Sequence, residues 1–147
     1  MTHPPRVRQI MVTFPKRLGA DARIADVRAE FEDEHVHMVL VVDRDGRLVT
    51  AIERLDLTPE LDASSLASVC GRLEGRTVSP MTPLPAITRL LGSTGRRRLA
   101  VVDDDGLLRG LVCLKRSRSG YCDDKDVRAR ANERGETLPA RLPRALA

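Results

Sequence analysis

The feature that most constrains this chain is an internal repeat. The segment Val39–Val49 aligns without a gap with Leu99–Arg109, and the same offset takes Gly46 to Gly106. The match extends backwards into the preceding residues, still without a gap. A repeated unit of this size indicates a fold in which two copies of one small motif pack against each other.

Each copy contains the pattern of a β-hairpin. Val39–Val42 is a short apolar run rich in β-branched residues, which is typical of a strand buried on both faces. Asp43–Gly46 follows as a turn, since Asp bonds readily to its own backbone and Gly accepts a positive φ angle. Leu48–Ile52 then returns as a second strand, so the sequence predicts strand, turn and strand in both copies.

Helix-period segments surround each hairpin. The apolar stripes that precede the hairpins are Ile24, Val27 and Phe31 in the first copy, and Leu84, Ile87, Leu90 and Leu91 in the second. Asp21 and Thr82 are the expected N-terminal caps of these helices. A further helix is predicted after each hairpin, over Leu61–Leu73 and over Asp123–Arg134, the latter ending at Gly135.

The predicted order in each copy is therefore β-α-β-β-α, an α/β (α+β) arrangement. One copy alone is too small to bury its sheet well. We expect residues 7–73 and 74–134 to pack face to face as one disc with a pseudo-twofold axis, followed by a flexible tail over residues 135–147.

The amino-acid composition limits the classes of function that this chain can have. The chain has 147 residues, of which 41% are hydrophobic and 31% charged, and this indicates a soluble globular protein. Only 2% are aromatic, which argues against stacking platforms for single-stranded nucleic acid. The net charge of +4 has one tight cluster, Arg96–Arg98, so nucleic acid is an unfavoured partner. No membrane-length apolar run or secretory signal is seen, and we expect a cytoplasmic protein.

Reactive side chains form no recognisable catalytic pattern. Cys70, Cys113 and Cys122 are far apart in sequence and suggest neither a zinc site nor a disulfide framework. Cys113 falls in a predicted strand, where a small apolar role in the core is expected. His35 and His37 share a face if the chain is extended, but no suitable third metal ligand is evident. No nucleophile and base can be assembled, so we expect no enzyme and no metal.

The whole pattern resembles a tandem pair of CBS (cystathionine-β-synthase-type) domains, also called a Bateman module. The resemblance rests on "LVVDRDGRLVTAIERLDL" at Leu40–Leu57 and "AVVDDDGLLRGLVCLKRS" at Ala100–Ser117. Val7–Met11 resembles the lead-in of the first copy, and Arg76–Pro80 resembles the start of the second. The resemblance covers Val7–Arg134, which is nearly the entire chain.

Such pairs sense adenosine-containing ligands, and AMP, ATP or S-adenosylmethionine would be the regulatory ligand here, with no firm cofactor. In the family an Asp before the last helix holds the ribose hydroxyls, and a Ser or Thr three residues earlier assists. Asp56 matches that Asp in the first copy, whereas Glu53 replaces the Ser or Thr. In the second copy Cys113 and Arg116 occupy these positions, and an Arg accepts no hydrogen bond from a diol.

The resemblance therefore implies a binding site in the cleft between the copies. Its adenine would lie beside Leu18 and Ile52, its ribose on Asp56, and its phosphates near Arg54 or the histidines His35 and His37. Arg116 could meet a phosphate or another anion together with Arg96, Arg97 and Arg98, or be a solvated surface residue of a degenerate site.

The resemblance further implies a homodimer that signals to a separate effector protein. The alternative is a CBS pair with degenerate sites that acts as a dimerisation or protein-docking module.

Overall fold

The computed structural model describes residues 3–142 and contains two three-stranded sheets. In each sheet a short first strand pairs in parallel with the second, and the second pairs antiparallel with the third. The first sheet comprises β1 (Arg17–Gly19), β2 (Met38–Val42) and β3 (Leu48–Glu53), and the second comprises β4 (Thr77–Val78), β5 (Arg98–Val102) and β6 (Leu108–Cys113).

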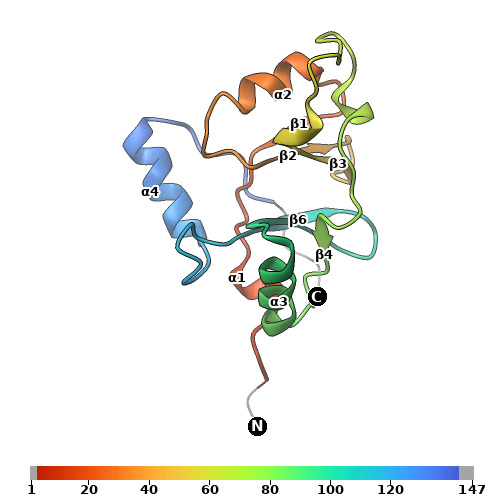
Figure 1. Cartoon of the computed structure of the whole chain (residues 1–147). Helices are drawn as coiled ribbons and strands as arrows, with labels where there is room; N and C mark the ends of the chain where they lie inside the picture. Colours follow the sequence, from red (N-terminus) through yellow and green to blue (C-terminus); the bar gives the residue numbers. More distant parts are fainter. Residues whose placement is uncertain (1–2, 143–147) are drawn as a thin grey trace.

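The two sheets face each other, and one helix covers the outer face of each. Helix α2 (Ile24–Glu30) covers the first sheet and α3 (Leu84–Thr94) the second, at opposite ends of the view in Figure 1. The layer between the sheets is aliphatic; its fully buried members include Leu40, Ala51 and Ala100. Strand β2 is buried on both faces, as its sequence predicts, and the predicted pair of packed repeats is confirmed.

The hairpin turns of the two repeats bond to each other. The Asp43 side chain accepts hydrogen bonds from two backbone N–H groups of its own turn, and Gly46 adopts a φ of 88°. The N–H of Leu48 then donates to the carbonyl of Gly106 at 3.0 Å, and the N–H of Leu108 donates to the carbonyl of Gly46 at 3.0 Å. These reciprocal bonds mark the pseudo-twofold axis that the repeat predicts.

Each repeat also lends its leading segment to the sheet of the other. The short helix α1 (Val7–Ile10) precedes the first repeat but packs in the core of the second, where Val7 is fully buried. The 3₁₀ turn η2 (Ala67–Val69) occupies the position of α1 at the repeat offset, and it packs in the core of the first repeat. We call these two passages of the chain between the repeats crossings. An isolated β-bridge follows each of them: Val12 pairs with Leu111, and Arg72 pairs with Ala51.

Helix α4 (Asp124–Arg134) lies beside the two sheets, along one side of the molecule (Figure 1). Its predicted cap is confirmed, because the Asp123 side chain accepts a hydrogen bond from the N–H of Asp126 at 2.8 Å. Its predicted end at Gly135 is confirmed as well, with φ at 66°. Near that end Arg134 forms an ion pair of 3.1 Å with Asp33, so a helix of the second repeat reaches the first.

The helix predicted over Leu61–Leu73 is wrong. This segment forms turns and contains only η2, because its backbone bonds to another part of the chain. The N–H of Ala67 donates to the carbonyl of Ala22, and the N–H of Ile24 donates to the carbonyl of Ser65. The side chain of Asp62 further holds a local turn by accepting from Ser64. These bonds replace the helical hydrogen bonds that the apolar spacing suggested.

Smaller differences concern the ends of elements. The residues that cap α2 and α3 are Arg23 and Pro83, not Asp21 and Thr82. The opening strand of the first repeat is β1, while Val7–Met11, the predicted lead-in, contains α1.

Of the predicted tail, residues 143–147 lie outside the described part of the chain. Within the described part, Leu142 is buried and its N–H donates to the carbonyl of Thr13 at 2.9 Å. No helix between residues 3 and 142 is both long and apolar enough to cross a membrane.

Candidate functional site

The predicted ribose acceptor, Asp56, is already bound within the protein. It lies in the 3₁₀ turn η1 (Arg54–Asp56), directly after β3. Its carboxylate accepts two hydrogen bonds from Arg76, at 2.6 and 3.1 Å, and a third from the N–H of Glu53 at 2.7 Å. The Arg76 residue is only 3% exposed and also donates to the carbonyl of Ala51 at 2.8 Å.

Glu53 belongs to the same network. Its carboxylate accepts hydrogen bonds from Arg96 at 2.9 and 3.2 Å and lies 3.0 Å from Arg76. Desolvation would raise the pKa of Asp56, but the hydrogen bonds from Arg76 and Glu53 and the charge of Arg76 together lower that pKa. The network joins the first repeat to the second, and it occupies the carboxylate that a ribose would need.

Arg54 and Ile52 also have internal roles. The Arg54 guanidinium donates to the carbonyls of Phe31, Asp33 and Val36 and lies 4.8 Å above the Phe31 ring. It therefore fixes the connection between α2 and β2. Ile52 is fully buried in the core of the first repeat. Neither residue lines the cavities described next.

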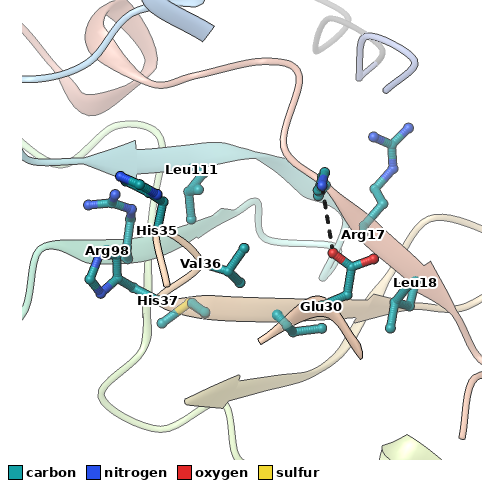
Figure 2. Close-up of a pocket in the computed structure, with 11 residues that line it drawn as sticks. Arg17, Leu18, Glu30, His35, Val36, His37, Arg98 and Leu111 are labelled. Carbon is teal, nitrogen blue, oxygen red and sulfur yellow. Dashed lines mark ion pairs between the residues drawn. The ribbon is translucent and has the colours of Figure 1, made fainter. Parts of the chain in front are cut away.

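The other predicted residues meet at two adjoining cavities. The first has a volume of about 150 Å³ and an apolar middle formed by Val36, Leu111 and other side chains. Figure 2 shows Arg98, His35 and His37 at one end of this cavity, with Leu18 and Glu30 at the other.

The second cavity, of about 450 Å³, shares three of these residues with the first and is predominantly basic. The side chains that line both cavities are His35, His37 and Arg98. The cationic side chains that line the second cavity are Arg97, Arg98, Lys115, Arg116 and Arg130. Glu34 is the one carboxylate among its lining residues.

The charge of the second cavity is largely uncompensated. Among the described residues, no ion pair within 4.0 Å involves any of its five cations, although nine such pairs occur elsewhere. Arg98 is partly buried and donates only to the carbonyls of Arg97 and Leu114. Cations that lack a carboxylate partner leave positive charge available for an anion.

The pKa of His37 reflects the same excess of positive charge. Partial desolvation of its ring, followed by the charges of Arg98 and Arg97, lowers its pKa to about 4. The imidazole is therefore neutral near pH 7, and its Nε2 lies 2.8 Å from the guanidinium of Arg97, which donates to it. His35 bonds instead to Asp33, so the two histidines have different partners. Residues 3–142 contain no group of three or more His, Cys, Asp or Glu side chains suited to a metal ion.

The structure thus separates the predicted site residues into two groups. Leu18, His37, Arg98 and Arg116 line the adjoining cavities, whereas Glu53 and Asp56 stabilise the interface between repeats and Arg54 and Ile52 act within the first repeat. Sequence reasoning missed Arg130, because nothing in the repeat predicts that α4 crosses this side of the molecule. The Arg96–Arg98 cluster was visible, but only the fold separates Arg96, bound to Glu53, from the two that line the cavity.

Known proteins with a similar sequence or a similar fold were found for this chain. A family model described as the CBS domain matches residues 7–58. A CBS domain pair/ACT domain protein of Thermotoga maritima has a TM-score of 0.62 at 20% identity, covering 74% of this chain and 89% of that one. A CBS domain protein of Pyrobaculum aerophilum complexed with AMP has a TM-score of 0.60 at 21% identity, covering 77% and 94%.

A curated relative is longer. An inosine-5'-monophosphate dehydrogenase of Nitrosopumilus maritimus is 27% identical over 110 residues, which are 75% of this chain and 23% of that protein. The chain therefore spans about a quarter of the length of this relative.

Proposed function

Because residues 7–58 match the CBS domain family and the chain has the fold of a CBS domain pair, we propose a regulatory, non-enzymatic role in binding an adenosine nucleotide. The ligand would occupy the two adjoining cavities at Leu18, His37, Arg98 and Arg116. Its phosphates would lie among the cations and its adenine in the apolar compartment. Binding would shift the packing of the repeats, which a separate effector protein would sense.

The uncompensated charge of the second cavity supports this proposal most directly. Five cations converge there without an ion pair within 4.0 Å in the described chain, and the fold places an apolar compartment directly beside them. A nucleotide has this division of character, with anionic phosphates at one end and a flat apolar base at the other. The AMP complex of the structurally similar Pyrobaculum protein is consistent with such a ligand.

The ribose would not bind at Asp56, where the family resemblance placed it. The Asp56 carboxylate is occupied by Arg76, so the hydroxyl acceptor must come from elsewhere. Glu30 is the one carboxylate that lines the apolar cavity, and its ion pair with Lys16 is long, at 3.8 Å. Glu30 lies at the end of this cavity away from Arg98 and His37, so the proposal places it beside the adenine and places the ribose where the two cavities adjoin.

Thermal unfolding with AMP, ADP, ATP, adenosine and S-adenosylmethionine tests the proposal. A ligand at about 100 times its dissociation constant should stabilise the protein by about 2.7 kcal/mol. Arg116→Gln should reduce this stabilisation, because Arg116 is exposed and contributes a charge to the cavity. The matched control is Arg89→Gln, an exposed arginine on α3 that lines neither cavity.

The pKa of His37 provides a second measurement, by NMR titration. A bound phosphate would offset the positive charges of Arg97 and Arg98, so the pKa should rise from about 4. Absence of stabilisation by every ligand, together with an unchanged His37 titration, would contradict nucleotide binding. An equal loss of ligand stabilisation in Arg116→Gln and Arg89→Gln would instead contradict the assigned cavity.

A second candidate function is self-association, and exposed apolar side chains favour it. Leu55 is 95% exposed on η1 and Val69 is 71% exposed on η2. The two turns adjoin, because the Cys70 thiol contacts the carbonyl oxygen of Asp56 at 3.7 Å. Exposed large apolar groups of this kind often belong to protein interfaces. A second copy of this chain would cover them if the module is a dimer.

Sedimentation velocity across a concentration series tests this second candidate. We expect wild-type protein to dimerise and Leu55→Asp to shift the equilibrium to monomer, since a carboxylate would be buried at the interface. Met81→Asp is the control, because Met81 is 47% exposed and belongs to neither turn. A monomeric wild type, or equal effects of both substitutions, would exclude a dimer interface at Leu55.

A further inference from the structure

Two cysteines that are distant in sequence face each other beside the basic cavity. The antiparallel bridge between Leu114 and Tyr121 places Cys113 directly opposite Cys122. The N–H of Cys122 donates to the carbonyl of Cys113 at 2.7 Å, which fixes this register. Opposed residues of this kind have Cα atoms about 5.5 Å apart, which lies within the range that a disulfide bond spans.

The side chains of the pair share one environment. Both thiols belong to a small buried cluster with Val12, against which Val127 of α4 packs. Cys122 is only 5% exposed, and it lines the basic cavity of about 450 Å³, from which a reagent would reach it. Sequence reasoning suggested no pairing, because only the loop between β6 and α4 brings the two thiols together.

Positive charges favour the thiolate form of Cys122. Its sulfur accepts a hydrogen bond from Arg130 at 3.4 Å. The neighbouring Cys113 thiol lowers the pKa of Cys122 most, and Arg130 and Arg98 add to this effect against the cost of desolvation. The proximity of Cys122, together with burial, raises the pKa of Cys113. The geometry of the pair is asymmetric in the same sense, because Cys122 lines the basic cavity and Cys113 does not.

We propose that Cys122 and Cys113 form a thiol–disulfide exchange site for low-molecular-weight disulfides that carry carboxylates. Cys122 is the attacking residue, Cys113 is the resolving residue, and the arginines of the cavity attract the anionic substrate. The charge of the cavity selects this class of disulfide, and the register of the two cysteines permits the second step. The proposal does not require nucleotide binding.

The exchange proceeds in two steps. The Cys122 thiolate attacks one sulfur of the substrate, forming a mixed disulfide and releasing the first half as a thiolate. Cys113 then loses its proton to solvent and attacks the Cys122 sulfur, forming the Cys113–Cys122 disulfide and releasing the second half. The protein gives up two electrons, which reduce one disulfide to two thiolates.

Cys70 is an internal control. It is buried in the core of the first repeat, faces no other cysteine among the described residues, and has a pKa raised by desolvation and by the charge of Asp56. It lines neither the basic nor the apolar cavity. A thiol of this kind should be inert in the folded protein.

The test uses 5,5'-dithiobis(2-nitrobenzoate), an aromatic disulfide with two carboxylates, on the folded chain. Wild-type protein should release two coloured thiolates, and mass spectrometry should find a product lighter by two hydrogens with a Cys113–Cys122 link. Cys113→Ser should release one thiolate and retain the adduct on Cys122. Cys122→Ser should lose the reaction, and Cys70→Ser should behave as wild type.

Two further measurements do not depend on the folding of the cysteine variants. The rate should inflect well below about pH 8.5, the ordinary value for a thiol. The dicarboxylate reagent should also react faster, relative to neutral 2,2'-dithiodipyridine, than it does in the Arg116→Gln variant. A stable adduct on wild-type protein, a link that involves Cys70, or an inflection near pH 8.5 would overturn the proposal.

Discussion

Replacing Asp56 with asparagine should lower the free energy of unfolding by about 3 kcal/mol, because it leaves the buried Arg76 with an incomplete set of anionic partners. The Arg76 side chain is 4% exposed, and Asp56 supplies two of its hydrogen bonds. Glu53, at 3.0 Å, retains part of the compensation, so we expect the lower end of the range for broken buried pairs. Urea denaturation monitored by circular dichroism measures this loss.

A double variant separates charge from packing. Replacing both partners, as Asp56→Leu with Arg76→Met, should recover most of the lost stability, because no unpaired charge is then buried. Arg47→Gln is a suitable control, since its ion pair with Asp45 has side chains that are 53% and 75% exposed. A loss below about 1 kcal/mol for Asp56→Asn would contradict a structural role of the pair.

The same pair makes stability depend on pH. The pKa of Asp56 in the folded protein lies below its ordinary value of 3.8, so the unfolded chain binds this proton more tightly. The contribution of the pair is therefore complete above pH 3.8 and is lost as the pH falls through the folded pKa. Unfolding curves of Asp56→Asn should show a weaker dependence in this acidic range than those of wild type.

Asp56 also illustrates how far sequence reasoning reaches. The repeat predicted the position of Asp56 after a strand, and the structure confirms that placement. The partner could not be predicted, because Arg76 is distant in sequence and arrives through the crossing of the two repeats. A motif identifies which carboxylate stands at a position, while the fold decides whether a ligand or an internal arginine occupies it.

Whether a secondary-structure prediction was right depends on the same distinction between local and distant hydrogen bonds. The hairpin turns at Gly46 and Gly106 were predictable, because the Asp side chains that hold them lie within the same few residues. The segment Leu61–Leu73 was predicted wrongly, because its backbone bonds to residues 22–24, far away in the chain. The basic cavity likewise depends on α4, which contributes Arg130 and whose position no local pattern specifies.

Gly71 lies at the crossing where Arg72 pairs with Ala51. Replacing Gly71 with alanine should destabilise the protein by about 3 kcal/mol, since strain and overpacking each cost about 1–3 kcal/mol. Its φ is +81°, and an added Cβ would contact the carbonyl oxygen of Ala51 and lie 2.9 Å from side-chain atoms of Ile52 and Thr50. The neighbouring bridge from Arg72 to Ala51 prevents the backbone from moving away easily.

Gly92→Ala provides the control for this measurement. Gly92 lies in the interior of α3, and an added Cβ would meet no atom within 4 Å. That substitution should stabilise the protein by about 0.5–1 kcal/mol through helix propensity. Opposite signs for the two substitutions in urea denaturation would show that the crossing between Arg72 and Ala51 is rigidly packed. A loss below about 1 kcal/mol for Gly71→Ala would contradict rigid packing at this junction.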